Sequence, residues 1–292
     1  MTPYIIGQSK AIFGTWFYFP RYNVMFDCGE SACYTLGIHT SDIKYIFISH
    51  FHKDHYIGLI GIGCFLSRVT RKNNRKVKVF YHRNNEYEIK NIEFALKSLD
   101  IKNVFDFIPF NFNEKIEIDG KKFVEPFEVD HTAKYYKKGL TACGFRLLEY
   151  RKSLKSVYKN KIDKLTSNKA RAEFINKLKN NNIDIYNIND YTFITYCGDS
   201  LPIDFKKLKD TEILMHECTF LTKKELDAAH TDLESLSKAI KNNKANIGKI
   251  IIYHLSEKYI RQEKEYKDLI LEELKNFNVD VVEINRLYKY FI

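Results

Sequence analysis

The chain has 292 residues, of which 45% are hydrophobic and 29% are charged. These values are typical of a globular protein with a large buried core, and they exclude a disordered or fibrous chain. The formal net charge is +10. A basic protein is drawn to phosphate-rich partners or anionic surfaces, although a chain that uses many Lys residues for solubility has the same charge.

The sequence predicts a protein of a reducing compartment. Its six Cys residues are scattered through apolar runs and form no Cys-x-x-Cys pair, as expected of reduced core cysteines. The N-terminus lacks a basic region followed by a long apolar run, and no stretch of about 18 apolar residues is present. We therefore expect a cytoplasmic protein without a membrane span, with an organelle lumen as the alternative.

Strand and helix patterns alternate in the first half of the chain. In chain order, they predict strands over 10–19, 22–28 and 43–49, a helix over 56–69, a strand over 77–82, a helix over 85–99 and a hairpin over 115–129. The Asp119-Gly120 pair supplies the turn of the hairpin.

The second half begins with a segment of different composition. Residues 151–189 hold ten Lys and Arg against three acidic residues, with no Gly or Pro, and are typical of an inserted basic arm. The following elements are strands over 191–197 and 211–215, a helix over 232–241, a strand over 249–253, a helix over 257–277 and a strand over 279–284. Two sheets covered by helices in one domain, 1–292, fit this order better than two independent domains.

Four potential metal ligands follow the apolar run IKYIFIS within six residues: His50, His52, Asp54 and His55. Three imidazoles and a carboxylate would be costly to bury without partners, and both groups suit zinc and similar divalent ions. One short loop cannot bring all of them to one ion with good geometry. Two ions, roughly 3.5–4 Å apart, are the natural solution.

A pair of ions needs further ligands at the ends of other strands. Three residues satisfy this condition: His131 in EVDHT, Asp199 in YCGDS and His254 in IIYHLS. Each follows an apolar or β-branched run, where functional groups are commonly presented. The sequence therefore predicts a metal-dependent hydrolase.

The motifs resemble those of the metallo-β-lactamase superfamily and, more narrowly, the ribonuclease Z family of tRNA 3′-processing endonucleases. The resembling stretches are NVMFDCGES, ISHFHKDHYIGLIGI, VDHTAKYYKKGLTACGFRL, ITYCGDS, MHECTF, AHTDLES and IIYHLSEKY. They occur in the order of that family and span most of the chain. The resemblance implies an α/β (in some schemes α+β) four-layer αββα sandwich, an RNA substrate and a homodimer.

Carried over position by position, the resemblance implies that one ion is bound by His50, His52 and His131. The other is bound by Asp54, His55 and His254, and Asp199 bridges both. The ions are expected to be Zn²⁺, with Mn²⁺ as the alternative. A bridging hydroxide would attack phosphorus and release the 3′ trailer of precursor tRNA.

Three residues are expected to move or control protons in this reaction. Asp54 could accept the proton of the nucleophile, and His230 in AHT matches the family position suggested for donation to the departing 3′-oxygen. Glu217, from chemistry alone, is a carboxylate that could orient His230. A structural role is the alternative for both His230 and Glu217.

Several other residues are linked less clearly to a function. His39, His82 and His216 are not expected to be metal ligands. Tyr135-Tyr136 and Lys137-Lys138 could contact nucleic acid, or form a solvated loop.

Three other functions compete with the endoribonuclease. A phosphodiesterase acting on a cyclic nucleotide or another RNA is the main alternative, because the N-terminal region lacks the Pro-Lys-Arg-Asn-like loop of many ribonuclease Z proteins and holds only Pro20-Arg21-Tyr22-Asn23. A thioester or lactam hydrolase fits the basic charge and the HECTF and AHT segments less well. A non-catalytic nucleic-acid-binding relative would have lost metal ligands, and all seven are present.

Overall fold

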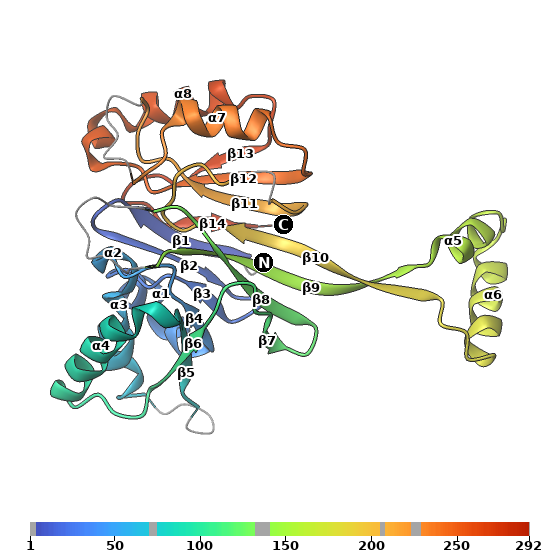
Figure 1. The fold of residues 1–292 in the computed structure, drawn as a ribbon, viewed down its shortest axis with the longest axis horizontal. Helices are drawn as coiled ribbons and strands as arrows, with labels where there is room; N and C mark the ends of the chain where they lie inside the picture. Colours follow the sequence, from blue (N-terminus) through green and yellow to red (C-terminus); the bar gives the residue numbers. More distant parts are fainter. Residues whose placement is uncertain (1–3, 70–74, 132–140, 205–207, 223–228, 292) are drawn as a thin grey trace.

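Two seven-stranded sheets form the centre of the molecule (Figure 1). The computed structural model describes residues 4–69, 75–131, 141–204, 208–222 and 229–291. The first sheet has, in spatial order, β14 (Tyr288–Tyr290), β1 (Ile5–Lys10), β2 (Gly14–Phe19), β3 (Val24–Phe26), β4 (Tyr45–Phe47), β5 (Val77–His82) and β6 (Phe105–Phe110). The second has β13 (Val279–Val281), β12 (Ile247–Tyr253), β11 (Thr211–Glu217), β10 (Tyr186–Tyr196), β9 (Cys143–Leu154), β8 (Lys122–Glu128) and β7 (Ile116–Asp119).

Helices cover the outer face of each sheet (Figure 1). Beside the first sheet lie α1 (Ala32–Leu36), α2 (Lys53–Tyr56), α3 (Gly58–Leu66) and α4 (Glu86–Ser98), with the 3₁₀ turns η1 (Gly37–Asp42) and η3 (Arg83–Asn85). Beside the second lie α7 (Leu233–Lys241), η5 (Glu257–Gln262) and α8 (Glu263–Glu273). Among the described residues, no helix is long and apolar enough to cross a membrane.

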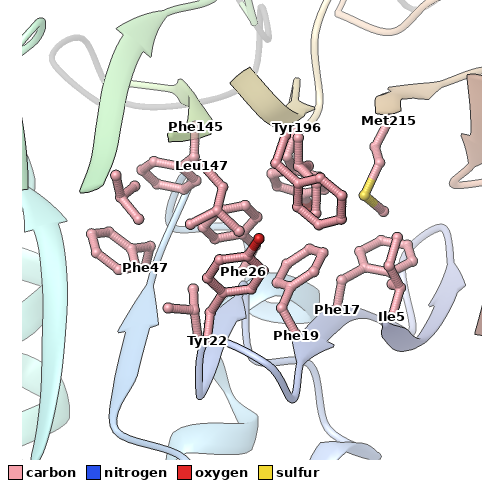
Figure 2. Packing of buried hydrophobic residues seen from close by; sticks show 14 of the residues in the cluster. Ile5, Phe17, Phe19, Tyr22, Phe26, Phe47, Phe145, Leu147, Tyr196 and Met215 are labelled. Atoms are coloured by element: carbon pink, nitrogen blue, oxygen red, sulfur yellow. The ribbon is translucent and has the colours of Figure 1, made fainter. Parts of the chain in front are cut away.

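Apolar clusters between the layers hold them together. The cluster between the sheets is rich in aromatic rings (Figure 2). There Phe26 from the first sheet stacks on Tyr196 from the second, with ring centroids 5.5 Å apart. Separate clusters join the first sheet to α3 and α4 and the second sheet to α7 and α8. The predicted four-layer αββα sandwich is therefore confirmed.

Most predicted elements are present, with revised limits. The expected strand over 10–19 is wrong as a single element, because a turn at Ala11–Phe13 separates β1 from β2. The expected helix over 257–277 is η5 followed by α8. The hairpin over 115–129 is formed by β7 and β8, and its turn residue Gly120 has φ +45°.

The basic segment is the tip of a long hairpin (Figure 1). Strands β9 and β10 pair antiparallel from Phe145↔Tyr196 outward to Leu154↔Tyr186. Beyond that last pair lie α5 (Ser156–Asp163) and α6 (Asn168–Asn180). The segment predicted as an insert over 151–189 thus includes the outer parts of both strands, and we call residues 151–189 the arm.

Two glycines allow the His50–His55 segment to pack against the loop that follows β3. A Cβ on Gly58 would lie 2.1 Å from the carbonyl oxygen of Gly29, closer than any real contact. Without it, the Gly58 N–H donates to the Cys28 carbonyl at 2.8 Å, and the Cys28 N–H donates to the His55 carbonyl at 2.7 Å. This close approach of two backbones fixes the position of His55 relative to the first sheet.

Candidate metal centre

The predicted ligands converge where the two sheets meet at their carboxyl ends. His50 to His55 follow β4, Asp199 follows β10 and His254 follows β12. Strands β3 to β6 are parallel, as are β10 to β13. Parallel strands present their final residues at the same edge of a sheet, so residues far apart in sequence meet there.

The structure brings all seven predicted ligands together in two groups. In each group the potential ligand atoms lie within 4.8 Å of one another. One group comprises His50, His52, His131 and Asp199, and the other Asp54, His55 and His254. Asp199 also forms a group with His230 and His254, so its carboxylate lies between the two sets.

Asp199 is at the centre of this arrangement. Its Oδ2 atom lies 3.2 Å from His55 Nε2, 3.3 Å from His254 Nε2 and 3.7 Å from His50 Nε2. Asp199 and all three imidazoles are buried. Asp54 Oδ2 approaches the second group in the same way, at 3.6 Å from His55 Nε2 and 3.5 Å from His254 Nε2.

Hydrogen bonds at Nδ1 turn Nε2 of four imidazoles toward the centre. His55 Nδ1 lies 2.8 Å from Asp27 Oδ2, and His131 Nδ1 lies 2.8 Å from the Ala229 carbonyl oxygen. His50 and His254 make the corresponding contacts at 3.0 Å with hydroxyls from Ser49 and Thr219. Metal-bound histidines are usually oriented in this way, by a partner on the other ring nitrogen.

The residues fit a bound cation. Three buried nitrogens, the Nε2 atoms of His50, His55 and His254, make no hydrogen bond to any residue that the structure describes, nor does Asp199 Oδ1. Buried polar atoms normally have partners, and leaving one without costs on the order of 1–3 kcal/mol. Divalent ions bound by these residues would satisfy all four atoms.

Electrostatics favour the neutral, metal-binding form of three of the histidines. Burial lowers the pKa of His52 to about 4, with the neighbouring His131 acting in the same direction. Burial also lowers the pKa of His50 and His131. These imidazoles are therefore neutral near pH 7, which leaves a nitrogen lone pair for a metal.

The two carboxylates are held in the ionised form. Burial alone would raise the pKa of Asp54, but His55 and His254 lower it to about 2. Burial opposes ionisation of Asp199 as well, and His254 and His55 overcome it to hold its pKa well below the usual range. Burial alone would lower the pKa of His55, but Asp199, Asp27 and Asp54 raise it well above its usual value. A metal bound there would take the place of the proton on this imidazole.

Asp27 is an important residue that sequence reasoning did not single out. It follows β3 with φ +55° and is fully buried. Its carboxylate accepts hydrogen bonds from the Ser49 N–H at 2.7 Å, the Ser49 hydroxyl at 2.8 Å and the Tyr196 hydroxyl at 2.5 Å, besides contacting His55. Its position directly after an apolar strand, shared with Asp199, was the available signal.

Glu217 and His230 form a pair next to the cluster. Glu217 Oε1 lies 2.9 Å from His230 Nδ1. The same carboxylate accepts hydrogen bonds from the Ser200 N–H, the Thr219 N–H and the Thr219 hydroxyl. Burial would raise the pKa of Glu217, but His230 lowers it. The His230 ring stacks on that of His254 at 5.3 Å.

The other histidines lie outside the metal groups. His39 is exposed and contacts Asp42. His82 accepts a hydrogen bond from the Asn84 N–H and packs 4.4 Å from the Phe112 ring. His216 is buried and hydrogen-bonded to the Glu217 carbonyl and the Ile203 N–H. The pairs Tyr135-Tyr136 and Lys137-Lys138 fall outside the described residues.

The turn Pro20–Asn23 lies at the opposite end of β3 from the cluster. It joins the end of β2 to the start of β3, whereas Asp27 and the metal groups follow the other end of β3. Tyr22 there donates a hydrogen bond to Glu149 at 2.6 Å.

The fold and the cluster together define a hydrolase of the metallo-β-lactamase fold with a site suited to divalent metal. Similar solved structures include the metallo-β-lactamase fold protein YhfI from Bacillus subtilis, with a TM-score of 0.60 and 15% identity, covering 97% of this chain and 99% of that one. The short form of human tRNase Z also has a TM-score of 0.60, with 16% identity over 99% of this chain and 100% of that one.

Sequence comparisons then define the family. Curated relatives named Ribonuclease Z match at 22–28% identity. The one from Saccharolobus solfataricus is 27% identical over 261 residues, which cover 81% of this chain and 80% of that protein. The family model described as Anti-Pycsar protein Apyc1 matches residues 16–175, more than half of the chain. The chain belongs to the family that this model describes, and its predicted resemblance to ribonuclease Z is confirmed.

Divalent metal should stabilise the fold through Asp199. For the wild type, Zn²⁺ or Mn²⁺ in excess over EDTA-treated protein should raise Tm by at least about 5 °C, because binding to the folded state alone adds RT ln(1 + [L]/Kd). For Asp199→Ala the rise should be largely lost. For the control Asp106→Ala, which removes a half-exposed carboxylate paired with Lys76, it should be retained. Equal rises in all three proteins, measured by thermal denaturation, would show that the metal acts elsewhere.

Proposed function

We propose that this protein is a metal-dependent endoribonuclease that cleaves the phosphodiester bond at the 3′ trailer of precursor tRNA. The observation that carries the proposal is the placement of a buried imidazole–carboxylate cluster directly beside the His230–Glu217 pair. Such a site can supply both a nucleophile and a proton for the leaving group. The curated relatives named Ribonuclease Z support the choice of substrate.

The ligand assignment follows the two groups of donors. His50, His52 and His131 would hold one ion, and Asp54, His55 and His254 the other, with Asp199 bridging both. Zn²⁺ is the proposed metal because imidazole and carboxylate donors suit it, with Mn²⁺ as the alternative. When bound, such ions lower the pKa of water and stabilise charge on phosphoryl oxygens.

The chain's own residues would manage the protons. The attacking water forms a bond to phosphorus while the bond from phosphorus to the 3′-oxygen breaks. Asp54, ionised at neutral pH, would take the proton of the water. His230, as an imidazolium whose Nδ1–H donates to Glu217, would give the proton on its Nε2 to the 3′-oxygen. The result is a tRNA with a free 3′-hydroxyl and a trailer with a 5′-phosphate.

The arm would bind the body of the tRNA. It is rich in Lys and Arg, and no residue of α6 is buried, so its charges are available to phosphates. Strand β9 begins beside the cluster, where the Cys143 N–H donates to the Ser49 carbonyl. Its 12 residues then span roughly 35 Å outward. A substrate that touches both regions of one chain must be large.

We also propose that the protein forms a homodimer, which would give the arm a second way to act on the substrate. In a dimer, the arm of one subunit could serve the site of the other. In either case the arm matters for a folded RNA and not for a small phosphodiester.

A second candidate is a phosphodiesterase that acts on a cyclic nucleotide or a different RNA. The sequence Pro20-Arg21-Tyr22-Asn23 favours it, because it departs from the Pro-Lys-Arg-Asn-like loop of many ribonuclease Z proteins. The chemistry at phosphorus would be the same, so substrate assays separate the two candidates.

The first prediction for function concerns the cleavage position. With Zn²⁺ or Mn²⁺, the purified protein should cut a precursor tRNA once, at its 3′ trailer, as read by gel mapping of end-labelled RNA. Asp199→Ala should lower the rate by at least roughly 10³-fold, because stabilisation of the phosphoryl charge is lost. If precursor tRNA stays uncut while 3′,5′-cyclic nucleotides or bis-p-nitrophenyl phosphate are hydrolysed, the second candidate replaces the first.

The role of His230 predicts a dependence on the leaving group. His230→Gln should lower kcat on RNA by roughly 10²- to 10⁴-fold, because the 3′-oxygen is a poor leaving group without a proton. The loss on bis-p-nitrophenyl phosphate should be far smaller, since p-nitrophenolate departs unprotonated. The exposed His39→Gln serves as the matched control. Equal losses of kcat on both substrates would assign His230 a structural or metal-binding role instead.

The arm predicts a dependence on substrate size. Residues 155–185 can be replaced by Asn-Gly, a two-residue turn suited to the Leu154↔Tyr186 pair. This variant should raise KM for precursor tRNA by at least about tenfold and flatten its salt dependence, while leaving kcat/KM for bis-p-nitrophenyl phosphate near the wild-type value. Replacing Lys159, Lys161 and Lys164 by Gln keeps the arm and should give an intermediate KM. Parallel losses on both substrates would rule out RNA binding by the arm.

A further inference from the structure

A strained turn joins the first two strands right beside the metal cluster. Ile12, at its centre, has φ +74°. β-Branched residues rarely adopt this left-handed region, because the side chain clashes with the backbone. Such strain persists only where surrounding contacts impose it, and it is often found at functional sites. We call residues Ala11–Phe13 the Ile12 turn.

Hydrogen bonds attach the Ile12 turn to the Asp54 side of the cluster. The Ile12 N–H donates to Asp54 Oδ2 at 3.1 Å. This is the same oxygen that lies 3.5 Å from His254 Nε2. Because the N–Cα bond is about 1.46 Å long, the Ile12 Cα lies within about 4.6 Å of a proposed metal ligand.

The turn is also tied to the loop that carries His254. The Ala11 N–H donates to the Leu255 carbonyl at 3.4 Å. Lys10 Nζ pairs with Glu257 at 3.0 Å, and Ser9 Oγ accepts the His254 N–H at 3.1 Å. The Phe13 N–H closes the turn by donating to the Lys10 carbonyl at 3.1 Å. The Ile12 turn is therefore a fixed part of the site rather than a loose loop.

Despite these contacts, two of the three side chains of the turn are exposed to water, and only Ala11 is buried. Ile12 is 82% exposed and Phe13 is 48% exposed. Lys10 Nζ lies 3.8 Å from the centre of the Phe13 ring and adds a positive charge. Two consecutive apolar side chains, held rigidly within reach of a metal ligand and open to solvent, are the kind of surface that a ligand covers.

We propose that the Ile12 turn is a binding surface for the nucleobase adjacent to the phosphate in the metal centre. This inference rests on the proposed function, in that the substrate is a nucleotide phosphodiester. A phosphate held by the cluster places its attached nucleoside within a few bonds of the turn. Every base has an apolar face that can pack on Ile12 and Phe13, so the contact would strengthen binding with little preference for sequence.

The backbone of the same turn also positions Asp54. The test must therefore separate base binding by the side chains from this effect on Asp54. Ile12→Gly keeps the N–H and suits a positive φ, but removes the side chain. Ile12→Asn also tolerates a positive φ and replaces the apolar surface with a polar one. Ile38→Asn is the matched control, because Ile38 is 68% exposed and lies in η1, before β4.

The measurement is calorimetric binding of adenosine 5′-monophosphate and of inorganic phosphate to the zinc-loaded protein. In Ile12→Gly and Ile12→Asn, the Kd for the nucleotide should rise by about tenfold more than the Kd for phosphate. Ile38→Asn should show the wild-type ratio. The Tm of Ile12→Gly should equal or exceed that of the wild type, because the backbone strain is relieved.

Two outcomes would overturn the proposal. In one, both Kd values rise by the same factor, which would mean that the turn acts only through Asp54. In the other, the nucleotide Kd does not change in either Ile12 variant. Failure of the protein to cleave precursor tRNA would refute the proposed endoribonuclease, but it would leave this ratio, and hence the nucleobase surface, standing.

Discussion

A buried carboxylate surrounded by imidazoles is the constraint on which the rest of the structure depends. Asp199 Oδ2 lies 3.2–3.7 Å from three buried nitrogens, and those nitrogens make no hydrogen bond to any described residue. So many polar atoms would not be buried together without compensation. Divalent cations would supply it, so metal binding and the stability of this region are expected to be coupled.

The two sheets each contribute half of the support for this cluster. From the first sheet, Asp27 orients His55 and also accepts a hydrogen bond from the Tyr196 hydroxyl of the second sheet. From the second sheet, Glu217 holds His230 and Thr219 holds His254. The aromatic cluster between the sheets fixes their separation (Figure 2). The site is therefore a product of the packing of the two sheets, which explains why its residues are spread along most of the chain.

How much of this could be predicted from the sequence depends on the range of each interaction. The ligand role of the segment His50–His55 and the strand-end positions of Asp199 and His254 could be predicted, because a local apolar run precedes each of them. Asp27 also follows an apolar run, but its role could not be predicted, since it depends on contacts with Ser49, which follows β4, and with Tyr196 of β10. The Ile12 turn was also missed, because the apolar run over 10–19 gives no sign of a break and Ile is unfavourable at positive φ. The arm was recognised by charge, but pairing across 32 residues, as between Leu154 and Tyr186, leaves no local signal.

The most direct test of the central claim is anomalous diffraction at the zinc edge from crystals of the zinc-loaded protein. The account predicts two peaks roughly 3.5–4 Å apart. One should lie among His50, His52 and His131, and the other among Asp54, His55 and His254, with Asp199 contacting both. A single peak, or peaks outside these two groups, would contradict it.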